Sequence, residues 1–359
     1  MDLLLKKCVS NDPQEISATL KKYTQEILTK FTFPELDKKD YRVKLWKALY
    51  DILKDEGLKE CHKLCLQIIR IISREKKDLN VLVTKEYLNL VLYHAALKDE
   101  KDISKTIDYD IALEGLMCLC NIVFNATMPR EMCCRNGTLE TILKRLRHHK
   151  DLPADINFFN MKILFIITAL CENVRTTLKE EMHGLIYLIE FLETMVKELK
   201  ESNHNVDIKN EPNKLSVINT NTTIEILKTL FNLTVCSKYQ QTTDEEELAH
   251  YLRLTVVLRD LLLVNIEEND KKLELDGHTI HLLLNIPDEC LKPLIHPLRE
   301  DEDVPCDMKY ERYNMSTLHE MLRYLKSRFT PEPGVKYQNE ILSPLPISSS
   351  YYVKRMLVG

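Results

Sequence analysis

The residues of this chain whose types and spacing come nearest to a catalytic or metal site are four closely spaced pairs of cysteines or histidines. A structural zinc site needs paired C-x2-C spacing or histidines at a matching distance, and no cysteine pair here has it. A metalloprotease site needs two histidines with a glutamate at helical spacing and a third ligand, which are also missing. We therefore expect buried thiols and no metal site. The pairs are Cys118 with Cys120, Cys133 with Cys134, His148 with His149, and His278 with His281.

Other catalytic patterns are absent from the sequence. It contains no G-x-S-x-G elbow, no P-loop and no kinase motif set. Only 7 glycines occur in 359 residues, whereas phosphate-cradling loops use glycine at positions of positive φ. We expect neither an enzyme nor a cofactor, and therefore a protein that works by binding.

The net charge indicates which partners to expect, and the N-terminus, the cysteines and the apolar runs indicate the cellular compartment. Lys and Arg total 50 against 55 for Asp and Glu, a net charge of −5, so nucleic acid is not an expected partner. The N-terminus MDLLLKKCVSNDP shows no secretory signal, and the 11 cysteines are expected to stay reduced. The longest apolar run, Ile163 to Cys171, is too short to span a membrane. The expected location is the cytoplasm.

The elements that must position any binding residues are predicted to be helices. Apolar residues recur with a period near 3.6, and no long segment alternates with period two. Five of the predicted helices resemble one another and, aligned on one polar position, lie 51, 47, 64 and 53 residues apart. Such a period is typical of armadillo and HEAT repeats. The five aligned positions are Arg70, Asn121, Thr168, Asn232 and Asn285.

Each of these five helices is apolar over most of its circumference and carries one narrow polar stripe. An inner helix of a repeat protein needs this pattern, because its flanks pack on neighbouring repeats while the stripe lines a concave surface. The predicted fold is all-α, an armadillo/HEAT-like right-handed superhelix, or α-solenoid. It extends over residues 1–329, with a loop insertion at about residues 200–218 and a divergent, disordered tail over residues 330–359.

Several of these segments resemble one known family. EILKTLFNLT from Glu225, FFNMKILFIITALCENVR from Phe158 and DGHTIHLLLNIPDECL from Asp276 are similar to segments of the synembryn family, also called resistance to inhibitors of cholinesterase. The similarity covers about Glu15 to Phe329. Beyond that range the chain still resembles the family as far as NEILSP, which ends at Pro344. Family members continue further, so the resemblance implies a chain shortened at its C-terminus.

The resemblance implies a cytosolic chaperone and receptor-independent guanine-nucleotide exchange factor for heterotrimeric G-protein α subunits. It implies binding of the GDP-bound or nucleotide-free α subunit as a monomer, in the cytoplasm and at the cell cortex, with membrane association only through this partner. The α subunit's C-terminal helix would lie in the concave groove. The implied groove residues are Arg70, Arg74, Asn121, Asn125, Phe165, Thr168, Lys228, Asn232, His281 and Asn285.

Simpler roles remain open for the same residues. The aligned asparagines are equally able to cap turns or bond neighbouring helices, Arg70 and Arg74 could be solvated charges, and Phe165 could belong to the core. Two other functions also remain open. One is a general armadillo scaffold or transport adaptor that binds extended peptides, and the other is a truncated isoform that binds α subunits without exchange activity.

Overall fold

The chain forms two compact units within the predicted 1–329 domain. The computed structural model describes residues 1–10, 12–98, 107–204, 214–235, 245–266, 268–299 and 304–329. Contacts group Met1–Ile167 into unit 1 and the chain from Thr168 onward into unit 2, so the boundary falls inside one helix. The predicted tail of residues 330–359 lies outside the described residues.

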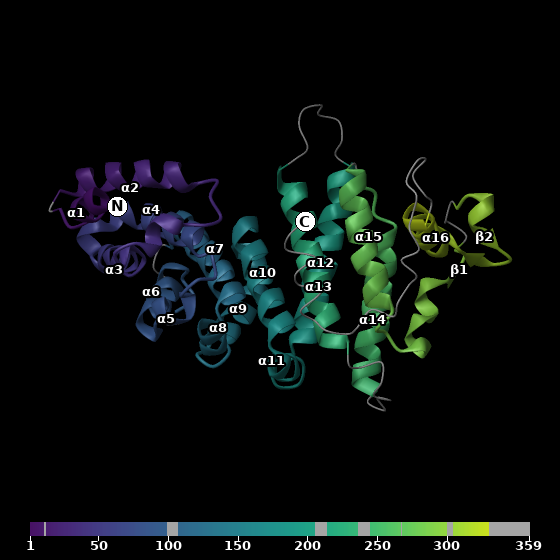
Figure 1. Cartoon of the computed structure of the whole chain (residues 1–359). Helices are drawn as coiled ribbons and strands as arrows, with labels where there is room; N and C mark the ends of the chain where they lie inside the picture. The colour runs from purple at the N-terminus through teal and green to yellow at the C-terminus, as the bar shows by residue number, and fades with distance from the viewer. Residues whose placement is uncertain are drawn as a thin grey trace. The chain divides into compact units, whose positions relative to one another are not determined.

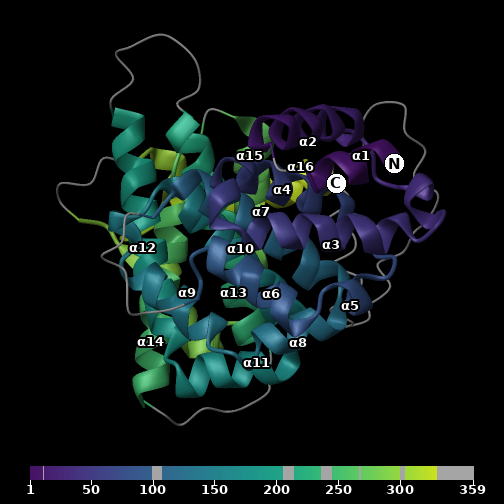
Figure 2. The same cartoon turned by 90° about the vertical axis from the view of Figure 1, so that its left-hand side faces the viewer.

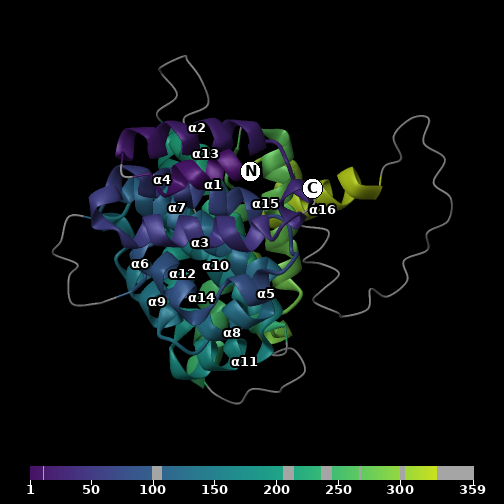
Figure 3. The same cartoon turned by 60° about the vertical axis from the view of Figure 1, so that its left-hand side comes forward.

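Unit 1 is built from helices whose starts carry the expected capping residues. Asp12 accepts a hydrogen bond from Gln14 N at 2.9 Å and Pro13 opens the next helix. In this unit α4 packs against both α2 and α7 (Figure 3), while α3 packs on α4 and α6 packs on α7 (Figure 2). The helices are α1 Asp2–Cys8, α2 Pro13–Ile27, α3 Tyr41–Lys54, α4 Lys59–Ile72, α5 Leu79–Leu82, α6 Lys85–His94, α7 Tyr109–Asn125, α8 Thr127–Cys133, α9 Thr138–Arg147 and α10 Ala154–Leu170, with short 3-10 turns η1 Pro34–Asp37, η2 Glu56–Leu58 and η4 His149–Asp151.

Unit 2 begins in the last turn of α10. Its central helix α13 packs against α12 and α15, and α14 packs against both α12 and α15 (Figure 1). Its helices are α11 Glu172–Thr176, the π-helical turn η5 Thr177–Glu181, α12 Gly184–His204, α13 Lys214–Thr234, α14 Glu245–Leu262, α15 Asn269–Leu283, η7 Asp288–Leu294, η8 Cys306–Met308 and α16 Ser316–Phe329.

Strand structure in the described residues is limited to one small antiparallel sheet in unit 2. Strands β1 His296–Pro297, β2 Lys309–Tyr310 and β3 Tyr313–Asn314 are two residues long, and β3 lies in the middle. Tyr310 pairs with Tyr313 across a tight turn. The prediction of an all-α protein is therefore confirmed at the level of class.

The helices end in an unusual way for a chain with so few glycines. The last four carbonyl groups of a helix have no partner within the helix, and many helices place a left-handed glycine just beyond their end. Here a cationic or amide side chain from a later segment donates to a carbonyl in the last turn of the helix or just beyond its end. These donors are Arg74 for α2, Asn121 and Asn125 for α4, Arg145 for α6, Arg130 for α7, Arg175 for α10 and Lys272 for α14.

The helices differ from the prediction at three places. Two of the predicted stripe helices end early, since α4 ends at Ile72 and α15 at Leu283, which leaves Arg74 and Asn285 in the turns that follow. The predicted loop at residues 200–218 is shorter, because α12 runs to His204 and α13 starts at Lys214.

Candidate partner-binding surface

In unit 1 a buried carboxylate joins the stripes of α4 and α7. Glu114 of α7 is buried, and both of its oxygens accept hydrogen bonds from α4. Gln67 Nε2 donates to Oε1 at 2.9 Å, and Arg70 Nε donates to Oε2 at 2.9 Å. Arg70 stays partly exposed. Polar residues of α4 and α7 therefore lie side by side in this unit.

The two asparagines of α7 bond the end of α4. Asn121 Nδ2 donates to the main-chain oxygen of Arg70 at 2.8 Å, and Asn125 Nδ2 donates to that of Ser73 at 2.9 Å. Both acceptors belong to the last turn of α4 or its cap, where carbonyl groups lack helical partners. The amide nitrogens of both asparagines are thus used within the chain, while the side chains remain partly exposed.

Arg74 joins the same stripe to α2. Its Nη1 donates to the main-chain oxygens of Leu28 at 2.8 Å and Lys30 at 3.1 Å, just beyond the end of α2. Its guanidinium also lies over the ring of Phe31, 5.1 Å from the ring centroid. Phe31 itself is largely exposed. The cation and the ring form a surface that could receive an apolar side chain next to a carboxylate.

The two predicted groove residues on α10 are both buried. Phe165, at the end of unit 1, is buried, which favours the core role left open above. Thr168, the first residue of unit 2, is fully buried. Arg175 Nε donates to the main-chain oxygen of Thr168 at 2.7 Å and so caps α10.

In unit 2 the aligned asparagines bond threonines. Asn232 of α13 donates to Thr168 Oγ1 at 3.0 Å. Asn285, in the turn after α15, donates to Thr234 Oγ1 at 3.3 Å and to the main-chain oxygen of Phe231 at 3.4 Å. Asn285 is buried and Asn232 is partly exposed.

Charged and titratable groups gather where α13 faces α15. Lys228 Nζ lies 3.2 Å from Glu225 Oε1, and both side chains are nearly buried. Burial, and then the nearby charge of Lys228, lower the pKa of His278 to about 4. One turn further, His281 is exposed, although partial desolvation and the charge of Arg328 lower its pKa as well. His281 is therefore the most accessible of the ten predicted groove residues.

Sequence reasoning missed the arginines that cap helix ends from the next short helix. Arg130 Nη1 donates to the main-chain oxygen of Val123 at 2.9 Å, and Arg175 does the same for α10. Each arginine stands five residues after the last residue of the helix that it caps. That spacing is shared by VFNATMPR and ITALCENVR and was the signal that could have found them.

The described residues also bear on possible metal sites and membrane-spanning helices. Across the part of the chain that the structure describes, no three histidine, cysteine or acidic side chains are placed to hold a metal ion. Cys118, Cys120 and Cys133 are buried, and Cys134 is partly exposed. No described helix is by itself long and apolar enough to cross a membrane, although α7 and α8, bent by 119°, pass that test together by length and composition.

Comparison with known proteins places the chain in a family. Residues 65–348 match the family model described as "Guanine nucleotide exchange factor synembryn". Chaperone Ric-8B of Mus musculus is 32% identical over 92% of this chain and 67% of its own length. Chaperone Ric-8A of Gallus gallus is 30% identical over 89% of this chain and 59% of its own length.

A third relative shows the same pattern of coverage. Chaperone Ric-8A of Danio rerio is 29% identical over 96% of this chain and 63% of its own length. The chain thus spans between 59% and 67% of the length of these curated relatives. Because the family model covers most of the sequence, including both units, the chain belongs to the synembryn family of guanine nucleotide exchange factors.

Proposed function

We propose that this chain is a cytoplasmic chaperone and exchange factor for the α subunits of heterotrimeric G proteins. The C-terminal helix of the α subunit binds along the polar stripes, and the complex favours release of GDP. Family membership over residues 65–348 is the observation that carries this proposal. The bonded stripe helices within each unit support it.

We also propose that the helices form an armadillo-like solenoid. Three of the hydrogen bonds between successive stripe helices span nearly the same number of residues, while the Asn232–Thr168 bond of unit 2 spans 64. Asn121 reaches the Arg70 carbonyl 51 residues earlier, Asn125 reaches Ser73 at 52, and Asn285 reaches Thr234 at 51. A recurrent separation of this size is what stacked two- or three-helix repeats produce.

The proposed surface suits a helix that ends in a free carboxylate. Arg70 and Arg74 are partly exposed cations, and Arg74 lies over the exposed ring of Phe31. Guanidinium groups bind carboxylates through paired donors, and amphipathic helices bind where apolar walls carry a few polar anchors. In unit 2, His281 supplies an exposed anchor whose removal breaks none of the internal hydrogen bonds described above.

Exchange follows from binding preference and needs no covalent step. If the chain binds the nucleotide-free α subunit more tightly than the GDP-bound form, reciprocity requires that it weakens GDP binding by the same factor. Binding to a newly folded α subunit would also stabilise that subunit by mass action, which is a chaperone effect.

A peptide titration and a pull-down test the binding part of the proposal. We expect a labelled peptide from the α subunit's C-terminus to bind the chain, as measured by fluorescence anisotropy, and an intact α subunit to be captured in GDP-containing buffer. His281→Ala should weaken peptide binding about fivefold with little change in stability, as expected for one exposed polar anchor. His148→Ala, an exposed histidine at the end of α9, is the matched control.

The outcomes separate the proposal from the general scaffold. Capture of no α subunit would refute the proposal. Binding of extended basic peptides in place of the C-terminal helix would favour a transport adaptor instead. Equal effects of the two histidine variants would remove His281 from the binding surface without affecting the rest.

A further inference from the structure

The last described helix of unit 2 has two different faces. Helix α16, Ser316–Phe329, reads STLHEMLRYLKSRF and packs against α15 and α14. At 100° per residue, Thr317 and Tyr324 lie on one side of the helix, and both are buried. Leu322 lies nearly opposite them. This geometry divides α16 into an inner and an outer face.

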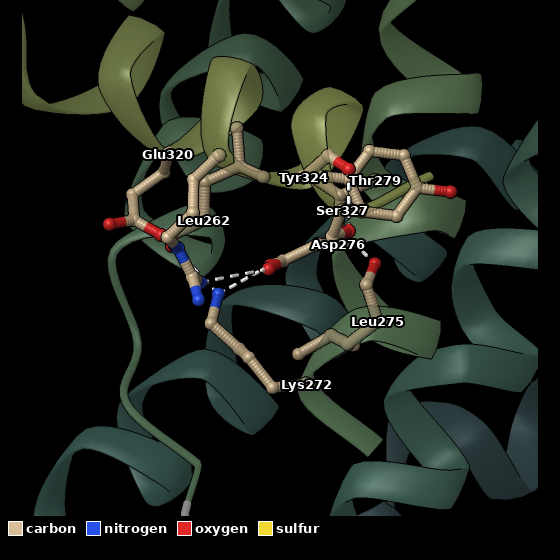
Figure 4. Close-up of polar contacts among 9 residues, drawn as sticks. Leu262, Lys272, Leu275, Asp276, Thr279, Glu320, Tyr324 and Ser327 are labelled. Carbon is tan, nitrogen blue, oxygen red and sulfur yellow. Dashed lines mark hydrogen bonds and ion pairs between the residues drawn. The ribbon is translucent and has the colours of Figure 1, made fainter. Parts of the chain in front are cut away.

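The inner face is fixed to α15 at a close approach. Tyr324 stands against Gly277, where an added Cβ would come within 2.7 Å of the tyrosine Oη. Figure 4 shows Tyr324, Glu320 and Ser327 of α16 beside Asp276 and Lys272 of α15. Arg323 of α16 lies 3.6 Å from Asp276 Oδ2 and 2.7 Å from Glu320 Oε2.

The buried partner of this contact is itself anchored. Lys272 Nζ is bonded to Asp276 and donates to the main-chain oxygen of Leu262 at 2.8 Å (Figure 4). Helices α14, α15 and α16 are thus joined through one polar cluster. The helix is held in place by its inner face, and among the described residues its outer face is the one left exposed.

The outer face is apolar with a basic flank. Leu318, Leu322 and Leu325 stand at i, i+4 and i+7 on one stripe, and Leu322 and Leu325 are 64% and 40% exposed. Lys326 flanks this stripe and is exposed, whereas Arg323 is paired with Glu320 and Asp276 on the side towards α15. An amphipathic helix with leucines beside Lys and Arg is the pattern of a helix that lies at a membrane surface.

The charge of this segment differs from that of the rest of the chain. Lys309–Phe329 holds five cations and two carboxylates, a net charge of +3, within a chain of net charge −5, so the remainder carries −8. Tyr310 and Tyr313, on the hairpin just before α16, are also exposed, and tyrosine favours membrane interfaces. The cations are Lys309, Arg312, Arg323, Lys326 and Arg328, and the carboxylates are Glu311 and Glu320.

We propose that the outer face of α16 binds an anionic lipid surface, with Leu322 and Leu325 entering the headgroup layer and Lys326 contacting lipid phosphates and carboxylates. An acidic protein groove fits less well, because it would have to enclose a helix of which one side is already buried on α15 and α14. This direct contact goes beyond the proposed function and adds to the membrane association through the α subunit that the family resemblance implies.

Vesicle co-sedimentation of the full chain tests this inference. The probes are vesicles of phosphatidylcholine alone and vesicles that also contain phosphatidylserine, with no α subunit present. We expect sedimentation only with the anionic vesicles, and its loss near 1 M salt, where the Debye length falls to about 3 Å. Lys326→Glu should weaken binding about tenfold, since each basic residue near an anionic surface contributes severalfold.

Matched variants identify the face. Leu322→Asp combined with Leu325→Asp should abolish sedimentation, whereas Leu284→Asp, at a residue 58% exposed beyond the end of α15, should not. Lys197→Glu, at a lysine of α12 whose side chain is 77% exposed, is the control for Lys326→Glu. Circular dichroism checks that the variants remain folded.

Several results would overturn the inference. One is equal binding to neutral and anionic vesicles, or to neither. Another is a double leucine variant that binds like the wild type. If that variant unfolds or changes oligomeric state in sedimentation velocity, the leucines are covered by this chain itself or by a second copy. Binding of an acidic protein without vesicle binding would assign the face to a protein partner.

Discussion

The polar stripes of unit 1 and unit 2 carry the same residue types but bond in different ways. In unit 1, Asn121 and Asn125 donate to main-chain carbonyl oxygens at the end of α4. In unit 2, Asn232 donates to the hydroxyl of Thr168, and Asn285 donates to the hydroxyl of Thr234 as well as to the main-chain oxygen of Phe231. A carbonyl acceptor is supplied by any residue, whereas a hydroxyl acceptor depends on a particular side chain.

The buried glutamates of the two stripes also differ in how many of their oxygens accept a hydrogen bond. Glu114 in unit 1 uses both oxygens on α4, whereas Glu225 in unit 2 uses Oε1 on Lys228, and its buried Oε2 has no hydrogen-bond partner among the described residues. Unit 1 is therefore the better satisfied network. We infer that its stripe mainly holds helices together and that the stripe of unit 2 has more freedom to change.

The largest contrast is expected between Gly115 and Gly277, two of the glycines at which an added Cβ would meet a close neighbour. A Cβ at Gly115 of unit 1 would lie 2.7 Å from the backbone nitrogen of Ala95, which cannot move easily, while at Gly277 it would meet the end of the Tyr324 side chain. We predict that Gly115→Ala lowers the free energy of unfolding by about 3 kcal/mol and that Gly277→Ala lowers it by about 1 kcal/mol.

Urea unfolding can measure the two effects separately. Trp46, the only tryptophan of the chain, lies in α3 and reports on unit 1, while circular dichroism reports on both units. Tyr324→Phe removes the oxygen that the new Cβ would meet and should restore much of the loss in Gly277→Ala. Equal costs at the two glycines would contradict the comparison.

The next contrast lies between the two carboxylates. Glu114→Ala leaves the partly buried Arg70 and Gln67 without their acceptor, and we predict a cost of about 3 kcal/mol. Glu225→Ala should cost about 1 kcal/mol, because the same change also removes an unsatisfied buried oxygen. Denaturant midpoints measure both, with Glu114→Gln as the isosteric control. A larger loss at Glu225 would reverse the ranking of the two networks.

Acid should weaken unit 2 through His278. The folded-state pKa of this histidine is about 4, below the ordinary value of 6.5, so the unfolded chain binds the proton more readily. Stability is therefore lost as the pH falls from 6.5 towards 4, by about 2 kcal/mol at pH 5. His278→Gln should remove this part of the pH dependence of unfolding, and the exposed His319→Gln should not. An unchanged pH profile in His278→Gln would show that the histidine is not protonated on unfolding.

The smallest expected effect is the loss of the hydrogen bond that the Thr168 hydroxyl accepts from Asn232. A double-mutant cycle with Asn232→Ala and Thr168→Val should give a coupling energy of about 1 kcal/mol, since one hydrogen bond joins the two side chains. Asn121→Ala should cost a similar amount, but no side-chain mutation on α4 can couple to it, because its acceptor is the Arg70 backbone. Zero coupling in the first cycle would mean that the units do not differ in this respect.

Much of the fold could be predicted from the sequence because its signals are local. The capping of α2 by Asp12 and the helical segments around Arg70, Asn121, Thr168 and Asn232 follow from residue spacing alone. The early end of α15 could have been expected from Pro287, but the aligned Asn285 was placed on the helix.

The bonds of the stripe residues could not be predicted in the same way. The acceptors of Asn121 and Asn125 are main-chain atoms of a helix about 50 residues earlier, and every residue carries such an atom. Sequence reasoning therefore identified the polar positions but not whether their amides bond helices or a partner. The structure shows the first role, and the second remains a prediction.

Release of labelled GDP from a purified α subunit, with and without this chain, tests the central claim most directly. We predict faster release in the presence of the chain and capture of the nucleotide-free complex. Release at the intrinsic rate, with the α subunit still bound, would contradict the exchange activity and leave a module that only captures the partner.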